Sequence, residues 1–320
     1  MKTLDAMLDE YLELRRGLGF KLKTVESRLR GFVAFLKNKG ASRITTALAA
    51  HFASGSETRA GTTKKAYWCA IRGFALYLRG MGFAVEDLPP GLLGRHAVRM
   101  RPYIYTDKEV EQLLTLAWNY PLSKACARRY ALKPWTLHTL IGLLAATGMR
   151  LGEALNLRDD DVDWNEGVVR IKDAKFLKSR LVPVHPTTLD KLRAYRARRE
   201  RFFAEWGRRA QPCFFVTCRG KALRGRHACL DFHTLLRRAG LREPGAKRGP
   251  RLHDLRHRFA VATLLRWYES GKEVGNLMPV LATYLGHSGV SGTYWYLSNT
   301  PELMAAAKKC LEARWEGGAR

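Results

Sequence analysis

The second half of the chain contains five short segments whose polar residues could act together on a phosphate ester. They are rich in arginine, lysine, histidine and tyrosine, the side chains that bind phosphate, transfer protons and attack as nucleophiles. Each segment alone is weak evidence, because a tyrosine in an aromatic run usually belongs to a core. Their order and spacing are more specific. The segments are Thr147-Gly148-Met149-Arg150-Leu151-Gly152-Glu153, Lys175-Phe176-Leu177-Lys178-Ser179-Arg180, His253-Asp254-Leu255-Arg256-His257, Leu285-Gly286-His287 and Thr293-Tyr294-Trp295-Tyr296-Leu297.

Two of the segments place their polar residues on one face of a predicted helix. Arg150 follows a glycine that ends one helix, and Glu153 lies three residues later, where it can hold or orient the guanidinium. His253 and Arg256 have the same spacing at the start of another predicted helix. The sequence therefore predicts that the charged groups are presented from helix starts.

Taken together, the segments resemble the signature of the tyrosine recombinase, or phage integrase, family, and in particular the integrases of mobile elements. The match covers about residues 150–297, and the basic segment and helices before it agree with the family by pattern. The resemblance implies a catalytic set for breaking and rejoining DNA. Its members here are Arg150, Lys175, His253, Arg256, His287 and the nucleophile Tyr296, with Glu153 in a supporting role.

The chemistry explains these residue types. Two arginines can clamp the non-bridging oxygens of a phosphodiester with permanently charged, fork-shaped donors, which lysine cannot imitate. Because a phenol has a pKa of about 10, Tyr296 needs its proton removed as it attacks, and His253 is the expected acceptor, with His287 on the phosphate. Lys175 is expected to protonate the departing 5′ oxygen. The 3′-phosphotyrosyl product stores the bond energy, so we expect no cofactor, no ATP and no metal.

The tyrosine and the histidines have competitors nearby. Tyr294 is two residues from Tyr296, and the distance from His287 favours Tyr296 as the nucleophile. Tyr294 is then expected to be a packing residue. His257 follows the histidine–arginine pair directly, and we expect it to be a structural histidine.

The lysine and one arginine-rich helix also leave alternatives. Lys172, Lys175 and Lys178 all lie in the turn between two predicted strands, and the family pattern favours Lys175. Lys178 is expected to contact backbone phosphate at most. The segment 193–201 contains five arginines and is equally compatible with a helix that follows phosphates and with a solvated helix face.

The elements that must position these residues predict a mostly α fold with a small antiparallel β-sheet. Apolar residues recur at helical spacing in the first section, and a Gly/Pro-rich stretch and a basic segment follow it. A capping box, Thr106 with Glu109, begins the next domain. Helices are predicted at about 107–118, 136–147, 151–157, 187–206, 228–239, 254–269 and 277–285, and strands at 167–171 and 180–184. The predicted domains are 1–88 (helical, core-binding), 89–104 (basic linker), 105–298 (catalytic) and 299–320 (amphipathic helix and tail).

The charge predicts a nucleic-acid partner. Lysine and arginine number 56 against 29 acidic residues, a formal charge of +27, and basic residues exceed acidic ones in both halves. Such a surface attracts polyanions, and we expect double-stranded DNA. Basic side chains at or near helix starts are the expected phosphate contacts, because the N–H groups there also favour phosphate. They are Lys21, Lys23, Arg28, Lys64, Lys65 and, in the hairpin, Lys178.

Other classes fit less well. The N-terminus lacks the apolar core of a signal peptide, and the apolar runs are too short to span a bilayer, so we expect a cytoplasmic protein, nucleoid-associated if bacterial, with no membrane partner. The six cysteines are expected to be reduced thiols. Zinc binding by Cys213, Cys218, His227 and Cys229 is disfavoured by their spacing.

Three functions remain, and they differ in class. Strand exchange at specific sites, through a Holliday junction, is the leading hypothesis. By analogy it implies a homotetramer in the synaptic complex, with the C-terminal helix exchanged between protomers, and possible partner recombinases of the same element. A type IB topoisomerase that relaxes supercoils shares the chemistry. A catalytically inactive architectural DNA-binding protein is the third, and the complete residue set argues against it.

Overall fold

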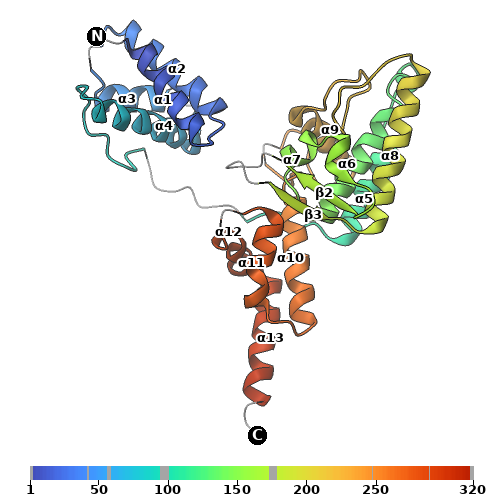
Figure 1. Ribbon diagram of the computed structural model, residues 1–320. Coiled ribbons are helices and arrows are strands. Elements are labelled where there is room, and N and C mark those ends of the chain that lie inside the picture. Colours follow the sequence, from blue (N-terminus) through green and yellow to red (C-terminus); the bar gives the residue numbers. More distant parts are fainter. Residues whose placement is uncertain are drawn as a thin grey trace. The chain divides into compact units, whose positions relative to one another are not determined.

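The chain divides into two compact units, residues 1–100 and 101–320, each with its own hydrophobic core (Figure 1). The computed structural model describes residues 3–41, 43–55, 59–93, 101–172, 179–246, 248–287 and 289–317. Nowhere in these ranges is a helix both long and apolar enough to cross a membrane. The boundary between the units lies inside the segment 89–104, where we predict a linker.

The first unit is built from helices. Threonine hydroxyls at Thr3 and Thr45 accept hydrogen bonds from backbone N–H groups and so begin two of them. Trp68 is fully buried, and its indole donates a hydrogen bond of 3.1 Å to the carbonyl of Pro89. The start of the predicted linker is thereby attached to this unit. The helices are α1 (Leu4–Gly17), α2 (Lys23–Asn38), α3 (Thr46–Ser54) and α4 (Gly61–Gly80).

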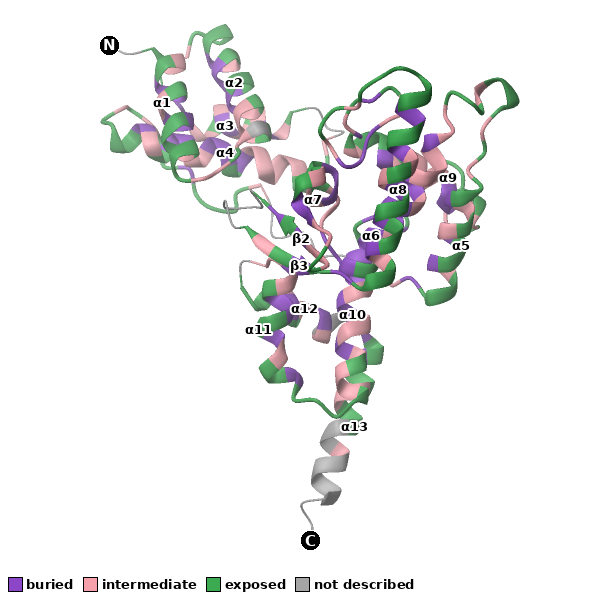
Figure 2. Ribbon diagram, turned by 45° about the vertical axis from the view of Figure 1, so that its right-hand side comes forward, coloured by how far each residue is buried: buried purple, intermediate pink, exposed green. Residues whose placement is uncertain are grey.

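The second unit is organised around one central helix, α6 (Leu132–Thr147), most of whose residues are buried. It packs against α5 (Asp107–Trp118), α8 (Pro186–Glu205), α9 (Gly225–Arg238) and α10 (Asp254–Glu269). The outer face of α8 is largely exposed, and the start of α10 is buried (Figure 2). The predicted capping box of α5 is present, with the Thr106 hydroxyl accepting from the Glu109 N–H at 3.2 Å.

A small antiparallel sheet lies beside these helices, in the order β1 (Val162–Asp163), β2 (Val168–Ile171) and β3 (Arg180–Pro183). Val168 pairs with Pro183, and β3 is an edge strand, as the proline predicts. The mostly α fold class with a small antiparallel sheet is confirmed. The two-residue strand β1 is too short to have been predicted from alternation.

A second cluster of apolar side chains joins α10 to α11 (Val274–Leu285), α12 (Ser291–Asn299) and α13 (Pro301–Gly317). Tyr296 on α12 and Leu303 on α13 are both buried in it. The helix α11 begins three residues earlier than predicted and contains Pro279, and α6 begins four residues earlier. The separate helix α12 was not predicted, because its aromatic run has no clear helical period.

Gly148, which ends α6, generates the first testable prediction. Its φ of +61° lies in the left-handed region, and a Cβ there would lie 2.6 Å from Cδ1 of Phe259. We expect Gly148→Ala to lower the free energy of unfolding by about 1–3 kcal/mol. The left-handed backbone strains an alanine, and the overlap of its Cβ with Phe259 adds to that cost. Urea unfolding of the full chain measures the difference.

Gly152→Ala is the matched control for this substitution. Gly152 lies four residues further on, inside the short helix α7 (Leu151–Asn156), and a Cβ there has open space. Alanine is the better helix former, so the control is expected to be neutral or to stabilise by up to about 1 kcal/mol. Equal destabilisation by both substitutions would contradict the account of Gly148.

Candidate active site

Arg150 is held in place by Glu153 and by the end of α11. It is the residue that precedes α7, and its backbone N–H donates to Oε2 of Glu153 at 2.8 Å. Its Nη1 donates to Oε1 of the same carboxylate at 2.8 Å, and its Nη2 donates to the carbonyl of Gly286 at 2.7 Å. The predicted role of Glu153 as a support for this guanidinium is therefore present in the geometry.

Glu153 also binds a second guanidinium, which the sequence analysis did not assign to the site. Arg180, the first residue of β3, donates to both carboxylate oxygens at 3.0 and 2.8 Å, and its Nε donates to the carbonyl of Tyr284. Glu153 is nearly inaccessible, with its side chain 8% exposed. Burial alone would raise its pKa, but the hydrogen bonds from Arg180 and Arg150 outweigh it and hold the pKa at about 2. Glu153 is thus a buried carboxylate shared by two arginines.

Arg256 lies deeper in the unit and is 2% exposed. Its Nη1 donates to the carbonyl of Gly148 at 2.9 Å, and its Nη2 donates to the carbonyl of Leu285 at 2.7 Å. Burial, and then the positive charge of Arg150, lower its pKa to about 10, so it stays protonated at neutral pH. The two guanidiniums therefore concentrate positive charge at a place where an anion would be attracted.

His253 is placed at the start of α10, beside the arginines. Much of its residue surface is accessible, yet desolvation by the surrounding protein, followed by the charge of Arg256, lowers the pKa of its imidazole. The ring is therefore neutral at neutral pH. It meets the ring of His257 edge to face, with centroids 4.9 Å apart.

Tyr296 is buried, and its hydroxyl contacts His257. The residue is 2% exposed, and its Oη lies 3.0 Å from Nδ1 of His257. Tyr294, expected to be the packing residue, is instead 46% exposed, so that prediction was wrong. On α12, the rings of Trp295 and Tyr296 contact His257 of α10, whereas Tyr294 is exposed. His257 is buried as a structural histidine would be, but its hydrogen-bond partner is the predicted nucleophile.

His287 is a second histidine close to the Tyr296 ring. Its ring and that of Tyr296 are stacked, with centroids 6.4 Å apart and an interplanar angle of 25°. Its Nδ1 lies 2.8 Å from the hydroxyl oxygen of Thr293, which is fully buried. The structure therefore brings Arg150, Arg256, His287 and Tyr296 into one neighbourhood, with His253 next to it.

The remaining predicted residues lie elsewhere or outside the described ranges. Lys175 and Lys178 are outside them. Lys172, the third lysine of the hairpin, forms an ion pair of 2.6 Å with Asp161. In the arginine-rich segment, Arg199 is buried and paired with Asp159 at 2.6 Å, so this arginine has a structural role.

The residues of the first unit predicted to contact DNA lie at or near helix starts. Lys21 is exposed just before α2, and Lys23 is its first residue. Arg28 lies over the ring of Tyr67, with its guanidinium carbon 5.1 Å from the centroid. Lys64 and Lys65 are in the first two turns of α4.

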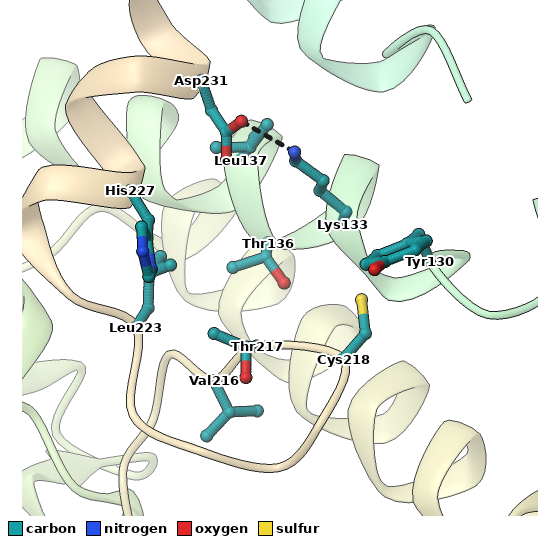
Figure 3. A pocket seen from close by; sticks show the side chains of 10 residues that line it. All are labelled: Tyr130, Lys133, Thr136, Leu137, Val216, Thr217, Cys218, Leu223, His227 and Asp231. Atoms are coloured by element: carbon teal, nitrogen blue, oxygen red, sulfur yellow. Dashed lines mark ion pairs between the residues drawn. The ribbon is translucent and has the colours of Figure 1, made fainter. Parts of the chain in front are cut away.

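A pocket of about 180 Å³ lies apart from these residues, between α6 and α9 (Figure 3). At one edge Lys133 pairs with Asp231 at 2.7 Å, and Cys218 and His227 also line it. The last two belong to the residues weighed for zinc. Within the described ranges, no group of three or more histidine, cysteine or acidic side chains is placed to hold a metal ion.

Comparison with known proteins gives concordant matches. The model of the phage integrase family matches residues 104–302. The chain is 41% identical over 320 residues to the inferred integrase/recombinase y4rB of Sinorhizobium fredii, covering 99% of each chain. It is 34% identical to the inferred integrase/recombinase y4rE of the same organism, covering 99% of this chain and 98% of that one.

Solved structures share the fold at low sequence identity. The Tn1549 transposon integrase in complex with transposon right end DNA has a TM-score of 0.63 at 13% identity, covering 98% of this chain and 99% of that one. A lambda integrase dimer bound to a COC′ core site has a TM-score of 0.60 at 17% identity, with coverages of 94% and 97%.

The shared carboxylate of Glu153 generates a stability prediction. We expect Glu153→Gln to lower the free energy of unfolding by about 2–4 kcal/mol at pH 7, because Arg180 loses its charged partner while buried. The pKa of Glu153 is depressed in the folded state, so its contribution is present above pH 4.5 and is lost toward pH 2. The difference between the two proteins should therefore shrink as the pH falls through that window.

Glu200→Gln is the control, and urea unfolding at several pH values is the measurement. Glu200 pairs with Arg196 on the surface of α8, with its side chain 57% exposed. Such a pair contributes little, so we expect a change within about 0.5 kcal/mol. An equal loss in both variants, or a pH-independent difference for Glu153→Gln, would contradict the assignment.

Proposed function

The chain belongs to the phage integrase family, and we propose that it uses the site around Arg150, Arg256 and Tyr296 to exchange DNA strands for a mobile element. As a member of this family of tyrosine recombinases, it is an enzyme that cleaves and rejoins DNA at specific sites. The mobile-element role is supported by the inferred integrase names of the relatives that match over the full length.

The proposed reaction assigns one task to each side chain. Arg150 and Arg256 bind the non-bridging oxygens of the scissile phosphate, and they stabilise the charge that grows there during attack. The Oη of Tyr296 attacks phosphorus, the bond to the 5′ oxygen breaks, and a 3′-phosphotyrosyl link forms. Lys175 gives a proton to the 5′ oxygen, and His287 donates a hydrogen bond to the phosphate.

The observation that carries this proposal is the convergence of the two arginines and Tyr296. The hydrogen bonds that Arg256 donates in the described structure go to backbone carbonyls, so no carboxylate is bound directly to its guanidinium there. A phosphate brought to it therefore meets a positive charge that is not held in a direct ion pair. Because Tyr296 is 2% exposed, attack also requires the segments that cover its hydroxyl to shift when DNA binds.

The assembly is proposed on a further feature, the terminal helix α13. Its Leu303 is buried in the cluster of its own unit, whereas Met304 next to it is 57% exposed. We propose a homotetramer on two DNA duplexes, in which α13 passes to a neighbouring protomer and couples the active sites. Other recombinases of the same element, and association with the nucleoid, belong to the same proposal.

Covalent capture of DNA tests the nucleophile. The full chain would be incubated with a library of nicked duplexes of random sequence, and adducts resistant to denaturant would be recovered and sequenced. We expect Tyr296→Phe to reduce the yield of adducts by at least about 10³-fold, because no other group replaces the nucleophile. Tyr294→Phe, the matched control on the exposed side of α12, should retain them.

The outcomes separate the competing functions. Adducts that persist in Tyr296→Phe and vanish in Tyr294→Phe would contradict the assignment. Tight, salt-dependent binding without any adduct would favour the architectural protein. Relaxation of supercoiled plasmid by a monomer, with no exchange between two captured sites, would favour the topoisomerase.

The first unit yields a prediction for DNA affinity. Lys21 lies just before α2, and Lys37 lies in the last turn of α2 and pairs with Asp5. We expect Lys21→Ala to reduce the slope of log affinity against log salt by about 1, because one phosphate contact is lost. Lys37→Ala should leave the slope unchanged. The affinity for the captured DNA site, measured across a salt series, tests this prediction. Equal slopes in the two variants would contradict a phosphate contact by Lys21.

A further inference from the structure

His257 is buried between the other aromatic groups of the site and directly contacts the hydroxyl of Tyr296. It is 5% exposed, and the Oη–Nδ1 distance is 3.0 Å. His253 on its own helix and Trp295 and Tyr296 on α12 surround the ring, with centroids 4.9 to 5.8 Å away. The imidazole therefore has little freedom to turn away from the hydroxyl.

The carboxylate of Asp254 lies near the other nitrogen of this imidazole, beyond hydrogen-bond distance, and its negative charge favours one direction of the hydrogen bond to Tyr296. Asp254 is 1% exposed, and its Oδ1 lies 3.9 Å from Nε2 of His257, on the side away from the tyrosine. A buried carboxylate favours the proton on the nitrogen that faces it, which leaves Nδ1 as an acceptor. The hydroxyl of Tyr296 then donates to Nδ1.

Asp254 is itself fixed by Arg251. The backbone N–H of Arg251 donates to Oδ2 at 2.8 Å, and its Nη2 donates to Oδ1 at 3.0 Å. The order carboxylate, imidazole, hydroxyl is the arrangement by which a general base activates a hydroxyl nucleophile. Here the hydroxyl is a phenol, and Arg256 lies close enough to attract a negative charge on it.

We propose that His257, oriented by Asp254, is the base that takes the proton of Tyr296 during cleavage and returns it during rejoining. The inference deepens the proposed function and rests on it. As the bond between Oη and phosphorus forms, the phenolic proton moves to Nδ1, and the electron pair of the breaking bond leaves on the 5′ oxygen. That oxygen takes a proton from the ammonium of Lys175. In the reverse step the 5′ hydroxyl returns its proton to Lys175 as its oxygen attacks phosphorus, the bond between phosphorus and Oη breaks, and His257 gives its proton back to the departing phenolate.

This assignment gives the two neighbouring histidines different tasks. His253, expected from the sequence to accept the proton, is the more accessible of the pair and lies beside Arg256. That position suits a hydrogen bond to the substrate phosphate. His257 lies against the nucleophile instead. The titratable groups that face it include Asp254 and His253 at the start of α10 and Tyr296 on α12. Arg256 lies on the same helix, His287 stacks on the Tyr296 ring, and Arg150 acts on Arg256.

The decisive experiment measures the rate of covalent adduct formation against pH in a single turnover. The full chain and a nicked duplex carrying the captured site are used from pH 5 to pH 9. A neutral imidazole is required, so the wild-type rate should rise with pH through the range in which histidine titrates. His257→Asn places an amide oxygen or nitrogen near the position that Nδ1 occupies in the wild type, but the amide cannot take a proton. We expect it to slow cleavage on the order of 10²–10⁴-fold and to remove the inflection.

Two further variants keep the test interpretable. His253→Gln, the matched control one turn away, should slow cleavage yet keep the inflection. Asp254→Asn keeps the shape of the carboxylate and removes its charge, so the inflection should move to lower pH. An inflection that survives in His257→Asn and disappears in His253→Gln would overturn the proposal.

A readout without DNA guards against misfolding and separates this inference from the proposed function. In protein labelled with ¹³C at tyrosine Cζ, the Tyr296 signal, identified by its loss in Tyr296→Phe, should shift as histidine titrates, and should not shift in His257→Asn. If Tyr296→Phe still forms adducts, the proposed function fails. If adducts depend on Tyr296 while His257→Asn keeps the wild-type rate and pH profile, only this inference fails.

Discussion

The site depends on one buried carboxylate, Glu153, that is shared between two guanidiniums. Its negative charge offsets the cost of holding Arg150 and Arg180 close together, and its pKa of about 2 means that it never loses that charge at working pH. Through the two arginines it joins the start of α7, the edge strand β3 and the end of α11. Segments separated by more than 100 residues are thereby fixed relative to the groups that we propose to bind the phosphate.

The ends of two helices supply the rest of the support. Both α6 and α11 end in a left-handed glycine, Gly148 and Gly286, and the carbonyls at these ends accept hydrogen bonds from Arg256 and Arg150. Helix C-termini carry partial negative charge, so they stabilise cations without neutralising them. The carbonyls thus hold the Arg256 guanidinium in place without a direct ion pair. This arrangement also makes the glycines part of the site and not only of the fold.

The sequence predicted the fold class and most helices because amphipathic spacing and glycine stops are local signals. It also predicted that Arg150, Arg256 and His287 would meet near Tyr296, because their order and spacing form a recognisable set. Arg180 was missed, since its partner is 27 residues away and no local pattern reports such a contact. The contact of His257 with Tyr296 spans 39 residues and could not be predicted for the same reason.

The most direct test of the account is the chemical identity of the residue that carries DNA after cleavage. Captured adducts would be digested with protease and nuclease, and the peptides sequenced by mass spectrometry. The account predicts a nucleotide joined through its 3′ phosphate to the peptide that contains Tyr296, with the fragment ions placing it on that side chain. A nucleotide on Tyr294, on a serine or on a 5′ phosphate would contradict it.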